Sequence, residues 1–304
     1  MKETKMVISH IKAGFGNQLF QYATGYAMAK RIGATYKLDL SHYRGKLLSQ
    51  FKLGFLNLTI VEASPDEIVL LKNEEPAPFV FKGLAKFGLS SRYRKASHIN
   101  ETFGFQVDHR IINRKKSSYL FGWCSVLAYF DYVKADLQSL FTMKGSFSSQ
   151  AEKYLQKIQE SESVALHIRR GDYLELDHFF KVLDMAYYEE ARDLMVKKLS
   201  KAKFFVFSND LEWVKKELSS WTVSLEFVDL NYDGAYSGQG DIEEFFLMKE
   251  CKHFIIANSS FSWWPAYLKP GYKEVFSPKV WFNDKSYQNS FAVNPLIEKN
   301  WTQL

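Results

Sequence analysis

Hydrophobic and polar positions along the chain form two recurring patterns: short apolar runs and longer amphipathic segments. The short runs are rich in β-branched and aromatic residues and predict buried strands, whereas the longer segments predict helices. In the first half, strands are expected at Met6–Ile11, Gly33–Leu40 and Tyr119–Trp123, and helices at Leu19–Ile32 and Ala128–Phe141. Helices that alternate with strands indicate a parallel sheet.

The same pattern returns after Lys144–Gln150, a stretch with serine and glycine that predicts a linker. The second half is expected to contain strands at Val164–Ile168, Phe204–Phe207, Leu225–Val228 and His253–Ala257, and helices at Ala151–Glu160, Tyr187–Leu199, Leu211–Leu218 and from Gly240 onward. We therefore expect an α/β chain of two Rossmann-like domains, residues 1–150 and 151–304, that face a cleft. The C-terminal segment could pack back on the first domain.

Residues 41–116 are less regular and carry Pro65, Pro76 and Pro78. We expect a variable, partly helical region there. Its basic patch, Arg92–Lys95, could meet an acceptor or a membrane surface, but a solvated run of charge is the favoured interpretation.

Composition narrows the class of protein. The chain has 304 residues, 46% of them hydrophobic, so a sizeable core is expected. A net charge of +6 fits an anionic substrate or an anionic membrane surface. No nucleic-acid-binding motif is present, so a nucleic-acid partner is not expected. The only cysteines are Cys124 and Cys251, and no signal peptide or membrane span is visible. These features favour the cytoplasm, or a peripheral position at the inner face of the membrane.

Three strands of the second half end in polar segments: Arg169–Asp172, Ser208–Asp210 and Asn258–Ser260. If the strands are parallel, these ends share one edge of the sheet, where nucleotides bind in such folds. Guanidinium groups neutralise a diphosphate, and serines at a helix start bond the same oxygens. Alternatively, the arginines and Asp172 form a surface turn, and the serines only cap a helix. Strand alternation places His167 and Arg169 on one side and Arg170 and Asp172 on the other.

A glycine loop, Ala13–Gln18, links the first strand to the first helix. Glycine lets the backbone approach a ligand, and a helix start offers free N–H groups. The loop is neither a Walker motif nor a complete dinucleotide fingerprint. The amides of Asn17 and Gln18 could bond a sugar or phosphate oxygen, or could simply cap the helix.

A metal is not expected, because the chain has no Asp-x-Asp and its seven histidines are scattered. The nearest acidic pair is Glu175 and Asp177, which is expected at the surface or facing an acceptor. Arginines at the phosphates would stabilise a leaving diphosphate without a metal.

Several segments together resemble the α-1,2-fucosyltransferases of glycosyltransferase family 11, of the bacterial type, in sequence, order and spacing. These segments are Gly14–Ala23, His167–Tyr173, Phe207–Asp210, Ala257–Trp264 and Glu298–Trp301. The resemblance covers nearly the whole chain. It implies a GT-B fold, with residues 1–150 as the acceptor-side domain and residues 151–304 as the domain that binds the donor, GDP-fucose. It also implies no metal or other cofactor, and inversion at the anomeric carbon.

Site residues follow from the resemblance position by position. Arg169 is expected to hold the β-phosphate with His167 alongside, while Arg170 and Asp172 brace the loop or contact the sugar. Asp210 is expected to read the guanine. Ser259, Ser260 and Phe261 are expected to bind the phosphates and ribose. The residues expected to close over the diphosphate and acceptor are Gly14, Gly16, Asn17 and Gln18. The chain departs from the family pattern at Ala13, where glycine is commoner, at Asn209, where Asp is commoner, and at Pro265, where glycine is commoner.

The expected reaction transfers fucose to the 2-hydroxyl of a galactose in an oligosaccharide or lipid-linked glycan, as in O-antigen synthesis. Asp172, Asp177 and Glu175 are candidate general bases, and Asn17 could instead orient the hydroxyl. Whether a β-1,3- or β-1,4-linked galactoside is used stays open, as does the oligomeric state. Another GT-B enzyme with a different nucleotide sugar, or a non-catalytic nucleotide- or glycan-binding protein, is the alternative.

Overall fold

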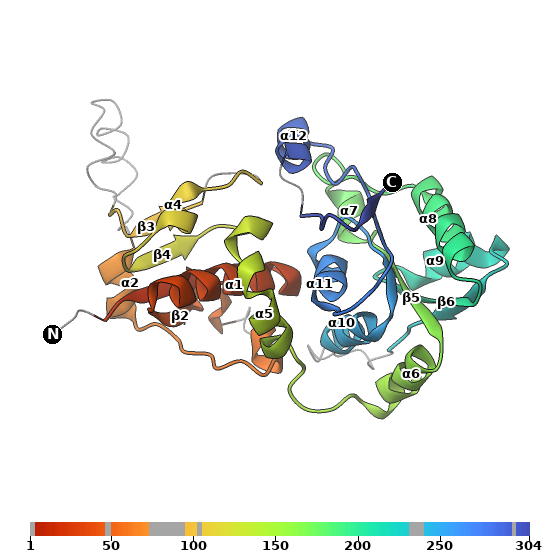
Figure 1. Cartoon of the computed structure of the whole chain (residues 1–304), viewed down its shortest axis with the longest axis horizontal. Coiled ribbons are helices and arrows are strands. Elements are labelled where there is room, and N and C mark those ends of the chain that lie inside the picture. Colours follow the sequence, from red (N-terminus) through yellow and green to blue (C-terminus); the bar gives the residue numbers. More distant parts are fainter. Residues whose placement is uncertain (1–3, 46–49, 73–94, 102–104, 231–239, 294–295) are drawn as a thin grey trace. The chain divides into compact units, whose positions relative to one another are not determined.

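The computed structural model describes residues 4–45, 50–72, 95–101, 105–230, 240–293 and 296–304. The chain divides into two compact units (Figure 1). The first comprises residues 1–54 and 58–135, and the second residues 55–57 and 136–304. Residues 136–150, expected to close the first domain, therefore count with the second unit.

The first unit is built on a parallel four-stranded sheet of order β2-β1-β4-β3. Its strands are β1 (Met6–His10), β2 (Thr35–Asp39), β3 (His98–Asn100) and β4 (Ser118–Phe121). Its helices are α1 (Phe15–Ile32), α2 (Pro65–Leu71), α4 (His109–Asn113) and the short 3-10 turns η1 (Ser41–Tyr43), η3 (Leu53–Phe55), η5 (Leu127–Tyr129) and η6 (Asp131–Val133). The side chains of Ile8 and Tyr119 pack with Leu71 on the α2 side of the sheet.

A six-stranded parallel sheet of order β10-β9-β8-β5-β6-β7 forms the second unit.

The elements of the second unit alternate along the chain as the sequence predicts. Its strands are β5 (Glu162–Ile168), β6 (Ala202–Ser208), β7 (Ser224–Phe227), β8 (His253–Ile255), β9 (Val275–Ser277) and β10 (Thr302–Gln303). Its helices are α5 (Lys134–Leu140), α6 (Ser149–Gln159), α7 (Asp172–Glu175), α8 (Met185–Lys198), α9 (Leu211–Glu217), the 3-10 turn η7 (Leu218–Ser220), α10 (Gly240–Glu250), α11 (Ser260–Leu268) and α12 (Lys285–Val293). The C-terminal strand β10 pairs with β9, so the end of the chain extends this sheet.

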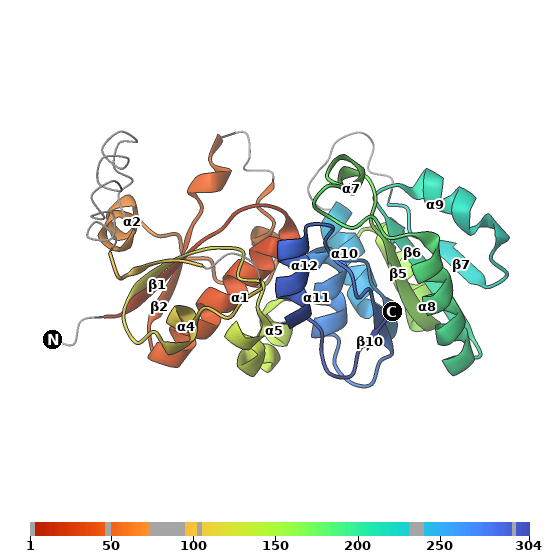
Figure 2. The same ribbon diagram turned by 90° about the horizontal axis from the view of Figure 1, so that it is seen from above.

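Helices cover both faces of the second sheet, with α8 and α9 on one side and α10 and α11 on the other (Figures 1 and 2). The first face packs alternate residues of β5, such as Val164 and Leu166, against Tyr188 and Met195 of α8. The intervening residues of β5, His167 among them, point toward α10 and α11. Both faces are apolar because the strands are buried on both sides.

Sequence and structure differ in two places. The helix expected at Ala128–Phe141 is broken into η5, η6 and α5. The elements β9, α12 and β10 were not predicted, because their sequence patterns are too short or too polar. Of the basic patch, Arg92–Arg94 lie outside the described residues. Within the described chain, no helix is long and apolar enough to cross a bilayer.

Candidate active site

The carboxyl ends of β8, β5 and β6 lie side by side, because these strands are parallel neighbours. From β5 the sheet grows through β6 and β7 on one side, and then through β8, β9 and β10 on the other. The strand order therefore reverses between β5 and β8. In open parallel sheets the ligand site lies beyond the carboxyl ends of the strands at such a reversal. The prediction that three polar strand ends share one edge is confirmed.

Arg169 follows β5 at this edge. Its Nη2 donates to the carboxylate of Asp172 at 2.9 Å, and its guanidinium carbon lies 5.6 Å from the ring centre of Tyr173. Its Nε is buried and has no hydrogen-bond partner within the described residues. The guanidinium thus has donor capacity left for an anion beside its ion pair.

Arg170 points to a different set of groups. Its guanidinium carbon lies 3.6 Å from the ring centre of Trp213, and its Nε lies 3.5 Å from Oδ2 of Asp210. Its backbone N–H donates to Oδ1 of Asn209 at 2.9 Å. At Gly171, where φ is +30°, a Cβ would fall 2.2 Å from Nδ2 of Asn209, so only glycine fits this turn.

Asp172 does not lie where strand alternation predicts. It was expected to face away from Arg169, but it bonds Arg169 and lies 3.4 Å from Nδ2 of Asn209. The expectation is wrong because β5 ends at Ile168 and the turn at Gly171 starts α7 at Asp172. The alternation of a strand does not continue through such a turn. The pairing of an arginine with Asp172, our simpler alternative, is thus present at the strand edge.

His167 is buried, with 3% of its surface exposed. Burial, assisted by the positive charge of Arg169, lowers the pKa of His167 to about 3. The imidazole is therefore neutral at physiological pH and cannot neutralise phosphate charge. Its Nδ1 is buried without a hydrogen-bond partner within the described residues, and its ring lies 5.8 Å from that of Phe261. A neutral imidazole with an unused nitrogen can exchange one hydrogen bond with a ligand.

The start of α11 completes the edge. Oγ of Ser259 accepts from the N–H of Phe261 at 3.3 Å, so Ser259 is a helix cap. Just before it, Nδ2 of Asn258 donates to two backbone oxygens, while its Oδ1 is buried without a partner in the described structure. Ser260 lies in the first turn of α11, and Pro265 lies inside the helix.

These groups suit a doubly charged anion. Two guanidinium groups supply positive charge, the first turn of α11 offers backbone N–H groups, and buried polar atoms of His167 and Asn258 lack partners among the residues described. A diphosphate presents oxygens for all of them. Asp210, expected to read a base, is engaged by Arg170.

Glu175 and Asp177 are exposed, and no described ion pair joins either carboxylate to the arginines. Among the described contacts, the backbone oxygen of Asp177 accepts a hydrogen bond from Nδ2 of Asn283 at 2.6 Å. In the described ranges, no three His, Cys, Asp or Glu side chains gather in a way that could hold a metal ion.

Glu244 on α10 is a candidate that sequence reasoning missed. Burial, together with the nearby charges of Asp241 and Asp229, raises its pKa to about 8. The next residue, Phe245, has its ring 5.7 Å from that of Phe261, which places this part of α10 beside the start of α11. A carboxyl group that stays protonated near neutral pH can donate a hydrogen bond to a ligand. Nothing in the pattern of an amphipathic helix marks such an acid.

The glycine loop of the first unit has its own geometry. Ala13 has φ of +65°, a left-handed conformation that favours glycine, and Gly14 precedes the first turn of α1. Gln18 is buried: its Nε2 donates to the backbone oxygens of Ala13 and Gln50, and its Oε1 accepts from the N–H of Lys52. Gln18 therefore holds the loop together. Asn17 is half-buried, and no described hydrogen bond engages its side chain.

The chain matches one protein-family model along its whole length. Residues 1–304 match glycosyl transferase family 11. The chain belongs to this family. The predicted resemblance is thereby confirmed, and with it the class of enzyme, a glycosyltransferase.

Individual relatives match along most of the chain. An α-1,2-colitosyltransferase from Escherichia coli is 32% identical, with 98% of this chain and 99% of the relative covered. The O-antigen biosynthesis glycosyltransferase WbnK of Escherichia coli is 29% identical, with 91% and 96% covered. Galactoside α-(1,2)-fucosyltransferase 1 of Bos taurus is 24% identical, with 95% and 73% covered.

The fold has solved counterparts. The fucosyltransferase NodZ from Bradyrhizobium superposes with a TM-score of 0.53 at 15% identity, covering 88% of this chain and 95% of NodZ. At this identity the likeness shows the fold alone. Together with the two parallel sheets, it confirms the predicted α/β, GT-B-like fold.

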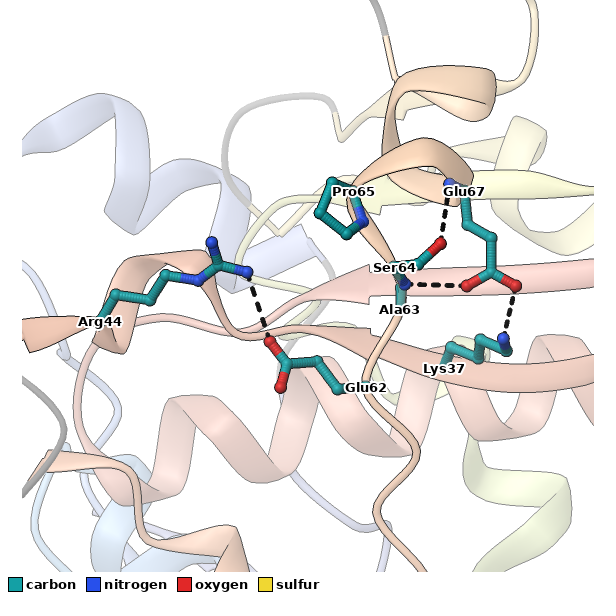
Figure 3. Close-up of a pocket in the computed structure, with 7 residues that line it drawn as sticks. All are labelled: Lys37, Arg44, Glu62, Ala63, Ser64, Pro65 and Glu67. Carbon is teal, nitrogen blue, oxygen red and sulfur yellow. Dashed lines mark hydrogen bonds and ion pairs between the residues drawn. The ribbon is translucent and has the colours of Figure 1, made fainter.

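A separate hollow of about 460 Å³ lies beside β2 in the first unit (Figure 3). Its charges are already paired: Lys37 with Glu67 at 2.5 Å, and Arg44 with Glu62 at 3.6 Å. Ser64 and Glu67 form a capping box at the start of α2. None of the residues predicted from the family 11 motifs lines this hollow.

Proposed function

We propose that this family 11 enzyme transfers fucose from GDP-fucose to the 2-hydroxyl of a galactose in a glycan, with inversion and without a metal ion. The observation that carries the proposal is the pair Arg169 and Arg170 at the reversal of strand order, next to the first turn of α11. The names of two of the relatives support it, because they describe α-1,2-transfer of colitose or fucose.

Arg169 and Arg170 would divide the work on the diphosphate. Arg169 exchanges its contact with Asp172 for oxygens of the β-phosphate, where charge develops as the sugar leaves. Arg170 is braced by Trp213, so it presents a fixed charge. His167 gives one neutral hydrogen bond, and Ser259, Ser260 and Phe261 at the start of α11 meet the remaining phosphate and ribose groups.

The transfer itself is a single displacement. The 2-oxygen of galactose bonds to C1 of fucose as the C1–O bond to the β-phosphate breaks, and the electron pair leaves with GDP. One displacement inverts the anomeric centre. Gly14, Gly16 and Asn17 of the first unit would contact diphosphate and acceptor, with Gln18 holding that loop.

The acceptor is expected to be a galactose-terminated oligosaccharide or a lipid-linked glycan. One relative is named for O-antigen biosynthesis, whose intermediates are glycans of this kind. The net charge of +6 is compatible with a peripheral contact at an anionic membrane surface.

A second donor has a specific observation in its favour. The 32% identical relative is named an α-1,2-colitosyltransferase. Colitose is fucose without its 3-hydroxyl, so a site for one sugar nearly fits the other. GDP-colitose is therefore the alternative donor for the same chemistry.

Donor and acceptor can be assigned in one experiment. The purified chain is incubated with GDP-fucose, GDP-colitose or GDP-mannose, β-1,3- or β-1,4-linked galactosides, and EDTA; GDP release and the product linkage are then measured. We expect an α-1,2-linked product from GDP-fucose, in the presence of EDTA, and a loss of at least about 100-fold in Arg169→Ala. Preference for GDP-mannose, or near-normal activity of Arg169→Ala, contradicts the proposal.

A further inference from the structure

The first unit carries a second cluster of chemistry-bearing side chains, at the carboxyl ends of β1 and β4. These strands are parallel neighbours, with Ile8 opposite Tyr119 in the register. His10 and Phe121 come two residues later on the same face, and their rings lie 5.1 Å apart. In the sheet order β2-β1-β4-β3, the chain reverses between β1 and β4, which is the ligand position of an open parallel sheet.

His10 is oriented by a carboxylate. Its Nδ1 lies 3.3 Å from Oδ2 of Asp39, which follows from the pairing of His10 with Asp39 in the β1–β2 register. The hydroxyl of Tyr119 donates to the same oxygen at 2.6 Å, and the N–H of Ser41 donates to Oδ1 at 2.9 Å. Burial of Asp39 opposes its ionisation, but these hydrogen bonds prevail and hold its pKa well below the usual range.

The tautomer of His10 follows from these contacts. Because Tyr119 gives its proton to the ionised Asp39, the hydrogen at Nδ1 of His10 is directed to Asp39 as well, and the lone pair is left on Nε2. Within the described residues Nε2 has no hydrogen-bond partner. The other titratable group facing the ring is His42, with its ring centre 6.2 Å away. A carboxylate-oriented imidazole of this kind can take a proton from a hydroxyl.

An aromatic surface lies next to His10. Nζ of Lys12 is 4.2 Å from the ring centre of Phe121 and 4.6 Å from that of Trp123. Trp123 is 43% exposed, which is unusual for a tryptophan and leaves part of its indole open to solvent. A sugar ring presents C–H groups on its apolar face and hydroxyls at its rim. The exposed indole of Trp123 can stack on the C–H groups, and the ammonium of Lys12 and the imidazole of His10 can bond to the hydroxyls.

We propose that this cluster binds the acceptor sugar, with the exposed indole of Trp123 beneath the pyranose ring, Lys12 at its rim, and Nε2 of His10 receiving the proton of the attacking hydroxyl. The inference rests on the proposed function and supplies the base that the sequence left open. As the acceptor oxygen bonds to C1 of the donor sugar, the C1–O bond to phosphate breaks and its electrons leave with GDP. The hydroxyl proton moves to His10, and from there to solvent.

Kinetics of matched variants test the proposal. His10→Gln keeps size and polarity but cannot take a proton, so kcat for transfer should fall by about 100-fold or more. Trp123→Ala should raise the acceptor KM about 10-fold with kcat little changed, and Trp123→Phe should recover most of the loss. His109→Gln and Tyr272→Ala, at exposed positions outside the cluster, serve as controls.

Two readouts separate this proposal from the proposed function. GDP affinity, measured by calorimetric titration, should be unchanged in Trp123→Ala, because the guanidinium groups proposed to hold the diphosphate belong to the second unit. Saturation-transfer NMR with methyl β-galactoside should show binding to the wild type and a clearly weaker signal from Trp123→Ala at the same concentrations, whether or not GDP-fucose is the donor. A loss of GDP affinity in Trp123→Ala, unchanged kcat in His10→Gln, or galactoside binding as strong in Trp123→Ala as in the wild type overturns the inference.

Discussion

The guanidinium of Arg170 lies over the indole of Trp213, 3.6 Å from its ring centre, and this contact joins the loop after β5 to helix α9. Arg170 also has an ion pair with Asp210, which is the residue just before α9. The loop that carries Arg169 is thus fixed from one side by α9. The contact ties the position of one arginine to an aromatic residue that no motif of the sequence had marked.

Trp213→Ala should therefore weaken GDP binding without unfolding the protein. A cation–π contact of this kind contributes about 1 kcal/mol, which corresponds to a loss of roughly fivefold in affinity. Calorimetric titration with GDP measures it, and Trp213→Phe should recover about half of the effect. Arg192 forms a similar contact with Trp221 elsewhere, so Arg192→Ala is a control that should bind GDP normally. If both variants lose affinity equally, the stack at Arg170 has no special part in binding.

Asp172 competes with phosphate for Arg169 in this structure. Asp172→Asn removes the charge of the competitor, so GDP affinity should rise by about threefold, while kcat for transfer stays within about threefold of the wild type. Asp177→Asn should be neutral in both measurements, because its carboxylate lies outside the cluster. A loss of kcat of more than about 100-fold in Asp172→Asn would identify Asp172 as the base and contradict the assignment of His10.

Ala13 occupies a left-handed conformation, with φ of +65°. The resemblance to family 11 had noted glycine as the commoner residue at this position, and the backbone gives the physical reason. Ala13→Gly relieves the strain of about 1–2 kcal/mol but makes the unfolded chain more flexible, so the net gain should be at most about 1 kcal/mol. Urea denaturation measures this gain. Gly25→Ala is the opposite case, because a Cβ there would lie 2.1 Å from Oγ of Ser9 and should destabilise the unit.

The sequence was informative where a local pattern determines the structure. The strands β1, β5 and β6 and the helices between them follow from periodicity, and the parallel arrangement then brings three polar strand ends to one edge. The orientation of Asp172 could not be predicted, because it depends on the turn at Gly171, which breaks the alternation of the strand. The engagement of Gln18 with the backbone of Gln50 and Lys52 was equally hidden, since it joins residues more than thirty positions apart.

The cluster of His10, Asp39 and Tyr119 shows the same limit. Its members come from three strands, and no spacing along the chain relates them. Only the register of β1 with β2 and β4 brings them together. Glu244 is a comparable case, since its raised pKa depends on burial and on Asp229 at the end of another strand.

Glu244 should make the stability of the second unit depend on pH. Its pKa is about 8 in the folded protein, against 4.5 for the ordinary side chain, so the folded state holds a proton that the unfolded state has lost. The contribution of Glu244 to the free energy of unfolding is therefore fully present below pH 4.5 and is lost as the pH rises toward 8. Glu244→Gln keeps the neutral form at every pH. Its Tm should match that of the wild type near pH 5 and exceed it by several degrees at pH 9, as measured by thermal unfolding in buffers of equal ionic strength.

Glu212→Gln, which changes an exposed glutamate on α9, should show no such divergence. A constant difference in Tm between Glu244→Gln and the wild type across this range would mean that Glu244 is ionised in the folded state.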